Sequence, residues 1–176
     1  LEGIYKVSAN LLGEVIPADR FSMTQITKQG DMLEVFALQG EGGAIPTGTQ
    51  LPIEGTAVGA AFSERHGIIV PDLTEKTYME NELLAKQGLK STLSVPLIVA
   101  GQAVGTLNFG STKPNNYTSR DQDLAIQAAS LMASSIESRQ QYERSQRQAE
   151  REAMLNTINQ KIQNATSVEA VLQIAA

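Results

Sequence analysis

The C-terminal part of the sequence contains no glycine or proline after Pro114. Thr118 is a residue type favoured at helix N-caps, and Asp121 follows three positions later, as in a variant of the capping box. A helix that begins there meets no breaker until about Thr166, and at about 1.5 Å per residue it would be roughly 70 Å long. No small domain buries a helix of that length. We therefore expect a compact domain with a long helix leading out of it.

Composition indicates a single globular domain before that helix. The 176 residues are 41% hydrophobic and 19% charged, which supplies enough apolar surface for a core. No apolar run approaches the roughly 18 residues of a membrane helix, and no signal-peptide pattern opens the chain. We expect a soluble, cytoplasmic protein without membrane contact. The chain starts at Leu1 and ends within a helix-like pattern, so we expect a piece of a longer polypeptide.

Charge and missing residue types exclude several functions. The net charge is −5 and no basic patch stands out, so we expect no nucleic-acid partner. The absence of cysteine removes disulfides, thiolate metal sites, thiol nucleophiles and thioether-linked cofactors. The single histidine, His66, lies in an expected polar turn without a second ligand or catalytic partner nearby in the sequence. We therefore expect no catalytic residue and no metal site, and the prediction is that the chain is not an enzyme.

Periodicity predicts a sheet with flanking helices before the long helix. Apolar residues three and four apart predict helices, and alternation between turn-forming residues predicts strands. Asn164 to Ser167 predicts a turn, after which another amphipathic helix would begin. The expected elements are a helix over 1–16 stopped by Pro17, a hairpin over 20–39, a loop and short helix over 54–64, a strand over 67–73, a short helix over 78–87 and a hairpin over 91–109.

This order of elements resembles the GAF domain family, a similarity that extends over residues 1–140. Five segments carry it: Leu51–Gly59, Ile69–Leu73, Gly88–Leu97, Gly105–Phe109 and Tyr117–Asp121. The resemblance implies an α+β fold, GAF-like and PAS-related. Its central antiparallel sheet would carry the terminal helices on one face and a ligand pocket on the other. Residues 141–166 would be a signalling-helix linker and 167–176 the start of a following domain, as in multidomain bacterial, often cyanobacterial, signalling proteins.

The resemblance, combined with strand alternation, predicts which residues face the pocket. The polar face would present Thr92, Ser94 and Pro96 on one strand of the second hairpin, and Thr106 and Asn108 on the other. In phytochrome-like GAF domains, hydroxyls at the positions of Thr92 and Ser94 hold the chromophore acids.

Four further residues belong to the predicted site. Asp72 falls where phytochrome-like GAF domains carry a pocket aspartate, although such a residue also commonly caps a turn. Phe62, Tyr78 and Leu83 are expected at the pocket, either as ligand contacts or as side chains that fill it.

Departures from the family's specialised branches narrow the function. Without cysteine, the chain cannot hold a covalent bilin or perform cysteine-based methionine sulfoxide reduction. Gly110 and Ser111 stand near the first two positions of the cyclic-nucleotide signature, which weakens that assignment. No cofactor is predicted with certainty, and an unknown small molecule remains the expected ligand.

The resemblance implies a sensor of signal transduction, such as a two-component system. A ligand would act through a homodimer formed by helices 1–16 and 118–165, part of it a coiled coil, on an output domain in the same polypeptide. The alternative is a ligand-free dimerisation and spacer domain.

Overall fold

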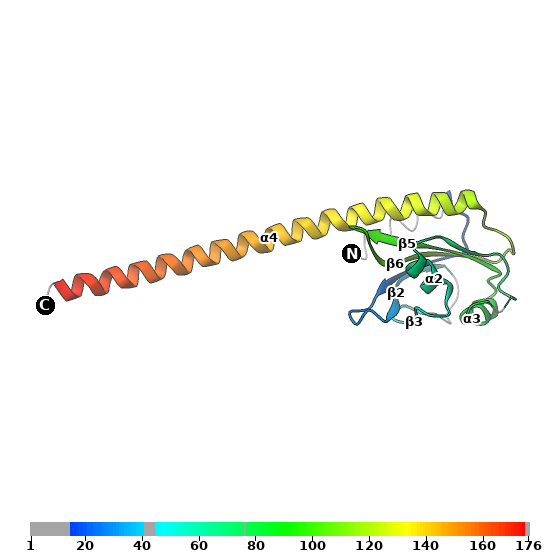
Figure 1. Ribbon diagram of the computed structural model, residues 1–176, viewed down its shortest axis with the longest axis horizontal. Coiled ribbons are helices and arrows are strands. Elements are labelled where there is room, and N and C mark those ends of the chain that lie inside the picture. The colour runs from blue at the N-terminus through cyan, green and yellow to red at the C-terminus, as the bar shows by residue number, and fades with distance from the viewer. Residues whose placement is uncertain (1–14, 41–44, 76, 175–176) are drawn as a thin grey trace. The chain divides into compact units, whose positions relative to one another are not determined.

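The computed structural model of the chain describes residues 15–40, 45–75 and 77–174 (Figure 1). The chain divides into two compact units, Leu1–Ser135 and Ile136–Ala176. The first unit contains the sheet and the second consists of helix. The helix expected over residues 1–16 lies outside the described residues, apart from its last two positions.

A six-stranded antiparallel sheet, ordered β3-β2-β1-β6-β5-β4, forms the centre of the first unit. The central pair, β1 and β6, joins the hairpin of β1 and β2 to the hairpin of β5 and β6. The strands are β1 Arg20–Ile26, β2 Met32–Gly40, β3 Gln50–Pro52, β4 Ile68–Val70, β5 Ser91–Val99 and β6 Gln102–Ser111.

Both predicted hairpins are present. Between β5 and β6, Ala100 and Gly101 have φ values of 49° and 76°. Two consecutive positive φ angles give the backbone of a type I′ turn, whose twist matches that of the paired strands. β3 was not expected, because Pro46 and Gly48 predict only a loop. Its three residues are held by pairing with β2, with Leu33 opposite Leu51.

Two short helices follow the predicted order but are shorter than expected. α2 spans Ala57–Glu64 instead of 54–64, because the Thr56 hydroxyl caps it by accepting the N–H of Gly59 at 3.1 Å. α3 spans Asn81–Lys86 instead of 78–87. Both therefore begin about one turn later than the apolar pattern predicts.

The long helix, α4, spans Ser119–Ile174. Its start is the predicted capping box: Thr118 N–H donates to Asp121 Oδ2 at 2.8 Å, and Asp121 N–H donates to Thr118 Oγ1 at 3.4 Å. The turn expected at Asn164 to Ser167 is wrong, since α4 continues through it. These residues are weak helix formers, but none removes a backbone hydrogen bond as proline does. Whether residues 167–176 begin another domain stays a prediction.

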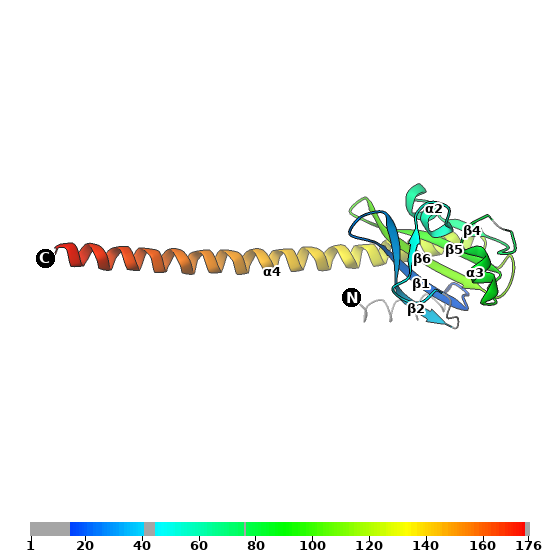
Figure 2. The same ribbon diagram turned by 90° about the horizontal axis from the view of Figure 1, so that it is seen from below.

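The first unit has three layers (Figure 1 and Figure 2). Residues 119–135 of α4 cover one face of the sheet, and α2 and α3 cover the other. Small buried residues of α4 let the helix approach closely, and Phe21 and Phe109 meet edge to face beneath it with ring centroids 5.3 Å apart. The α4-facing core consists of Phe21, Met23, Leu93, Val95, Leu107 and Phe109 on the sheet and Ala125, Ala129, Met132 and Ala133 on α4.

The antiparallel sheet with helices confirms the predicted fold class. Among the described residues, no helix has both the length and the apolar character that crossing a bilayer requires.

Candidate ligand-binding site

A cavity of about 50 Å³ lies on the sheet face opposite α4. That volume holds a few water molecules or a very small organic group. Its polar wall comes from three neighbouring strands, β1, β6 and β5, and its apolar wall includes Val58 of α2 and Leu84 of α3. The polar wall consists of Ser22 and Thr24 of β1, Thr92 and Ser94 of β5 and Asn108 of β6.

The structure brings three of the five predicted strand residues together at the cavity. Ser94 lies opposite Asn108 in the β5–β6 pairing, and Thr92 is on the same face two residues away. Thr106 is also buried, but its hydroxyl is 2.6 Å from that of Thr24 and the pair satisfies itself. Pro96 lies opposite Thr106 and is not part of the cavity wall.

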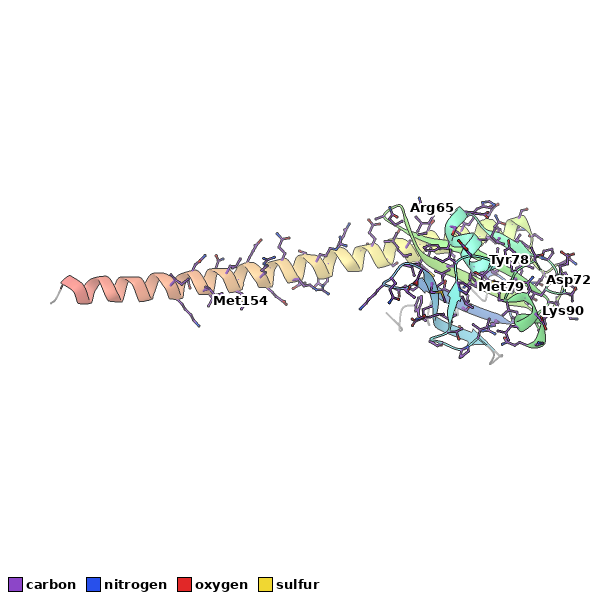
Figure 3. The ribbon with its side chains drawn as sticks, turned by 60° about the horizontal axis from the view of Figure 1, so that its bottom comes forward. Arg65, Asp72, Tyr78, Met79, Lys90 and Met154 are labelled. Carbon is purple, nitrogen blue, oxygen red and sulfur yellow. The ribbon has the colours of Figure 1, made fainter. Side chains whose placement is uncertain are left out.

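Asp72 lies away from the cavity, near Lys90 (Figure 3). Its Oδ1 accepts the backbone N–H of Thr74 at 2.8 Å. This hydrogen bond, and more weakly the Lys90 charge, hold the pKa of the carboxyl below its usual value. The structure therefore gives Asp72 the turn-capping arrangement considered from the sequence.

The three predicted apolar contacts also lie outside the cavity wall. Tyr78 packs against the cluster of Ala57, Val70, Leu73 and Leu89. Phe62 is half-buried and Leu83 is exposed. The neighbour of Leu83, Leu84, lines the cavity instead, because consecutive helical residues point about 100° apart. None of the three predicted residues fills the cavity.

Glu80 is a buried carboxyl group at this cavity, with 6% of its surface exposed. Its Oε1 accepts the N–H of Ala57 at 2.7 Å, whereas its Oε2 is buried without a hydrogen-bond partner in the described parts of the chain. Burial raises the pKa of Glu80, and hydrogen bonds from backbone N–H groups, including those of Ala57 and Val58, partly oppose the rise. Its sequence position at a helix start predicts a cap for α3. The carboxylate instead caps α2.

Arg20 is also a lining residue of the cavity, and only 5% of the residue is exposed. Its Nη2 donates to the carbonyl of Ile45 at 2.7 Å, and its Nη1 donates to Gln87 Oε1. Burial lowers the pKa of the guanidinium, but arginine stays protonated in proteins. Across the described residues, no ion pair joins Arg20 to Glu80.

Asn108 lines the cavity from β6, one of the two central strands of the sheet. It is 9% exposed, and neither its Oδ1 nor its Nδ2 has a hydrogen-bond partner within the described residues. A buried polar group without a partner typically costs about 1–3 kcal/mol. Two residues of the cavity wall, Glu80 and Asn108, thus carry buried polar atoms without partners among the described residues.

Arg20 and Glu80 were missed as site residues. Arg20, Ser22 and Thr24 alternate with Phe21 and Met23, and this polar face could have been recognised in the same way as that of β5. Glu80 gave no comparable signal, because its role depends on a contact with the start of α2 far along the chain.

His66 is exposed, as predicted, and its Nε2 lies 3.3 Å from Gln122 Nε2. In the described ranges, no group of three or more His, Cys, Asp or Glu side chains is arranged to hold a metal ion.

Comparisons with known proteins agree with this architecture. The family model described as "GAF domain" matches residues 10–137. Among solved structures, the chain is similar to the GAF domain of a two-component sensor histidine kinase from Bacillus halodurans, with a TM-score of 0.70 and 24% identity over 81% of this chain and 97% of that one. A search of curated proteins gave no match.

Two further similar structures come from different classes of protein. One is the GAF domain of a phosphoenolpyruvate-protein phosphotransferase from Coxiella burnetii, with a TM-score of 0.67 and 19% identity over 77% of this chain and 81% of that one. The other is a free methionine-R-sulfoxide reductase from Neisseria meningitidis, solved in complex with its substrate. Its TM-score is 0.66, with 19% identity over 77% of each chain.

Proposed function

The chain belongs to the GAF domain family, and we propose that it senses a small molecule at the cavity and regulates an output domain in the same polypeptide. The observation that carries this proposal is that two residues of the cavity wall, Glu80 and Asn108, hold buried polar atoms without hydrogen-bond partners in the described residues. Native cores rarely leave such groups without partners. A bound ligand that hydrogen-bonds to them would offset their desolvation.

The strands offer a direct route from the cavity to α4. Asn108 lines the cavity, whereas its neighbour Leu107 is fully buried and is not part of the cavity wall. A ligand that displaces β6 by a small amount therefore displaces the surface on which residues 119–135 of α4 rest, because packed cores transmit strain. The ligand must bind one arrangement of the helices more tightly than the other, since equal affinity shifts no population.

We further propose that the output is regulatory and that this domain has no catalytic activity of its own. GAF domains occur in sensor histidine kinases, which supports a role in signalling, including a two-component system. GAF-like structures also include methionine sulfoxide reductases. The proposal that this chain is not such an enzyme rests on its lack of cysteine. A cytoplasmic location and a homodimer through residues 1–16 and 118–165 belong to the same proposal.

Spin labelling tests the proposed transmission. Because the chain has no cysteine, Ser145→Cys places a single label on an exposed position of α4 in each chain. Compounds that stabilise the protein are first identified in a library of central metabolites by thermal shift. A ligand at about 100 times its Kd adds about 2.7 kcal/mol to the free energy of unfolding.

The distance distribution between the labels of two paired chains is then measured with and without each stabilising compound. We expect a shift with ligand that is lost when Asn108→Leu is added, since this variant removes both amide atoms. An unchanged distribution with every bound compound would contradict transmission. No stabilising compound in any library would favour the ligand-free spacer.

A further inference from the structure

We propose that the cavity binds a small zwitterion of the α-amino-acid type, with its carboxylate at Arg20 and Asn108 Nδ2 and its ammonium group at Glu80 and Asn108 Oδ1. This inference rests on the proposed sensing function and names the chemical class of its ligand. Its basis is the presence of two opposite, buried charged groups at one cavity without an ion pair between them.

Arg20 is suited to bind a carboxylate. Its hydrogen bonds to Ile45 and Gln87 fix the orientation of the guanidinium plane. A guanidinium has more N–H donors than these two bonds use, and its planar fork matches a carboxylate. Neither protein partner is charged, so the positive charge of Arg20 is hydrogen-bonded but not neutralised by them. A ligand carboxylate would neutralise it.

Glu80 is suited to bind an ammonium group. Its bond to the N–H of Ala57 fixes one oxygen and leaves the other, Oε2, without a partner among the described residues. Burial raises the pKa of this carboxyl, because loss of hydration disfavours the charged form. An adjacent ligand cation would reverse that effect by favouring the charged form.

Asn108 lines the cavity, and its side-chain amide holds a donor and an acceptor that both lack partners in the described structure. An α-amino acid places its ammonium group and its carboxylate on the same carbon, so one side-chain amide can bond to both at once. A ligand with only one charged group would leave either Arg20 or Glu80 without a counter-charge.

The rest of the cavity restricts the ligand's side chain. Its volume is about 50 Å³, and apolar walls come from Val35, Val58 and Leu89. Such a space favours a short aliphatic side chain over a long, charged or aromatic one. The ligand class is therefore a small aliphatic α-amino acid.

Isothermal titration of the full chain tests this inference with matched probes. L-alanine and L-valine carry both charged groups, propionate lacks the ammonium group, and ethylamine lacks the carboxylate. We expect a zwitterion to bind and both single-charge analogues to bind at least about tenfold more weakly, because a hydrogen bond to a charged group is worth about 1.5–3 kcal/mol.

Glu80→Gln is the decisive variant, since its amide oxygen can still accept the N–H of Ala57 while the charge is lost. We expect affinity for the zwitterion to fall about tenfold or more. Glu82→Gln is the matched control: it removes the same charge two residues away, from a surface ion pair with Lys86, and should leave affinity unchanged. Asn108→Leu supplies a second variant if Glu80→Gln does not fold, and it should also weaken binding by about tenfold or more.

Undiminished zwitterion binding by Glu80→Gln, or by Asn108→Leu, would overturn the inference. Equal binding of propionate or ethylamine would do the same, but the sensing function would stand because the cavity would still have a ligand. If neither these probes nor the metabolite library stabilises the protein, the inference and the proposed function both fail.

Discussion

Glu80 combines two roles at the scale of one residue. Its Oε1 caps α2 through Ala57, and its Oε2 is buried without a protein partner among the described residues, in a residue that lines the cavity. Burial of this carboxyl group does not stabilise the fold, because a carboxyl group that loses hydration on folding disfavours its own charged form. The cost of that ionisation should be visible as a pH dependence of folding.

We expect Glu80→Gln to remove a loss of stability that the wild-type protein shows as pH rises. The folded-state pKa of Glu80 is raised above its unfolded value, so between the two values the folded protein binds more protons and the free energy of unfolding falls as pH increases. At pH values below the pKa of the unfolded state, Glu80 is protonated in both states and this loss of stability is absent. Urea unfolding across this acidic-to-neutral window checks the prediction, and parallel pH profiles for the two proteins would contradict it.

We expect Asn108→Leu to leave the ligand-free protein as stable as wild type or more stable by about 1 kcal/mol. The substitution removes two buried polar atoms that have no partner within the described residues and retains a similar shape. Thr106→Val, in the same strand, is the control: it breaks the hydrogen bond to Thr24 and should cost about 1 kcal/mol. Urea unfolding at neutral pH measures both. A clear loss of stability in Asn108→Leu would show that the amide has a structural role.

Alternation along β5 and β6 was enough to place Thr92, Ser94 and Asn108 on one face. The same rule applies to Arg20, which was overlooked because a charged residue at a strand end is usually solvated. Strand alternation could not predict the role of Glu80. Its carboxyl group contacts Ala57 only in the tertiary structure, and no local sequence pattern encodes that contact.

At the scale of elements, α2 contributes Val58 to the cavity wall and approaches the preceding loop very closely. A Cβ atom added at Gly59 would lie only 1.8 Å from the backbone carbonyl oxygen of Ile53. That oxygen belongs to the main chain, so it cannot move aside as a flexible side chain would. The packing of α2 against this loop therefore requires a residue without a Cβ atom at position 59.

We expect Gly59→Ala to lower the free energy of unfolding by about 1–3 kcal/mol, because the clash forces α2 or the loop to shift. Ser63→Ala, on an exposed position of the same helix, should change it by less than about 0.5 kcal/mol. Chemical denaturation of the two variants makes the comparison. An equal, small effect in both would mean that α2 has room to move.

Elements governed by local chemistry were predictable, as the capping box of Thr118 and Asp121 and the turn at Gly101 show. Elements whose formation depends on a neighbouring strand were not predictable from the sequence. β3 exists because β2 offers it an edge. The failure at Asn164 to Ser167 has the opposite cause: weak propensities there predicted a turn, yet they do not interrupt a helix that lacks glycine and proline.

At the scale of the whole molecule, the second unit carries an apolar stripe along α4. Leu155, Ile158 and Ile162 are 50%, 41% and 58% exposed and recur at spacings of three and four residues. This spacing is typical of a helix that pairs with another helix. The proposed homodimer would cover the stripe.

We expect Ile158→Glu to weaken that dimer by at least about tenfold in Kd, because it places a charge at the centre of the apolar seam. Gln160→Glu adds the same charge on a different side of the helix and should leave the Kd unchanged. Sedimentation velocity over a concentration series measures the association. A wild-type chain that stays monomeric throughout, or a variant that associates as tightly as wild type, would contradict the prediction.

The pairing of β1 with β6 determines when the fold becomes complete during synthesis. These central neighbours join residues such as Met23 and Leu107, which are far apart in the sequence, so the sheet has high contact order. On a ribosome, the first hairpin must wait until β6 has emerged before it gains its second neighbour. Once β1 pairs with β6, one face of this strand pair forms part of the cavity wall and the other forms part of the core beneath α4. Both surfaces therefore depend on the same long-range pairing.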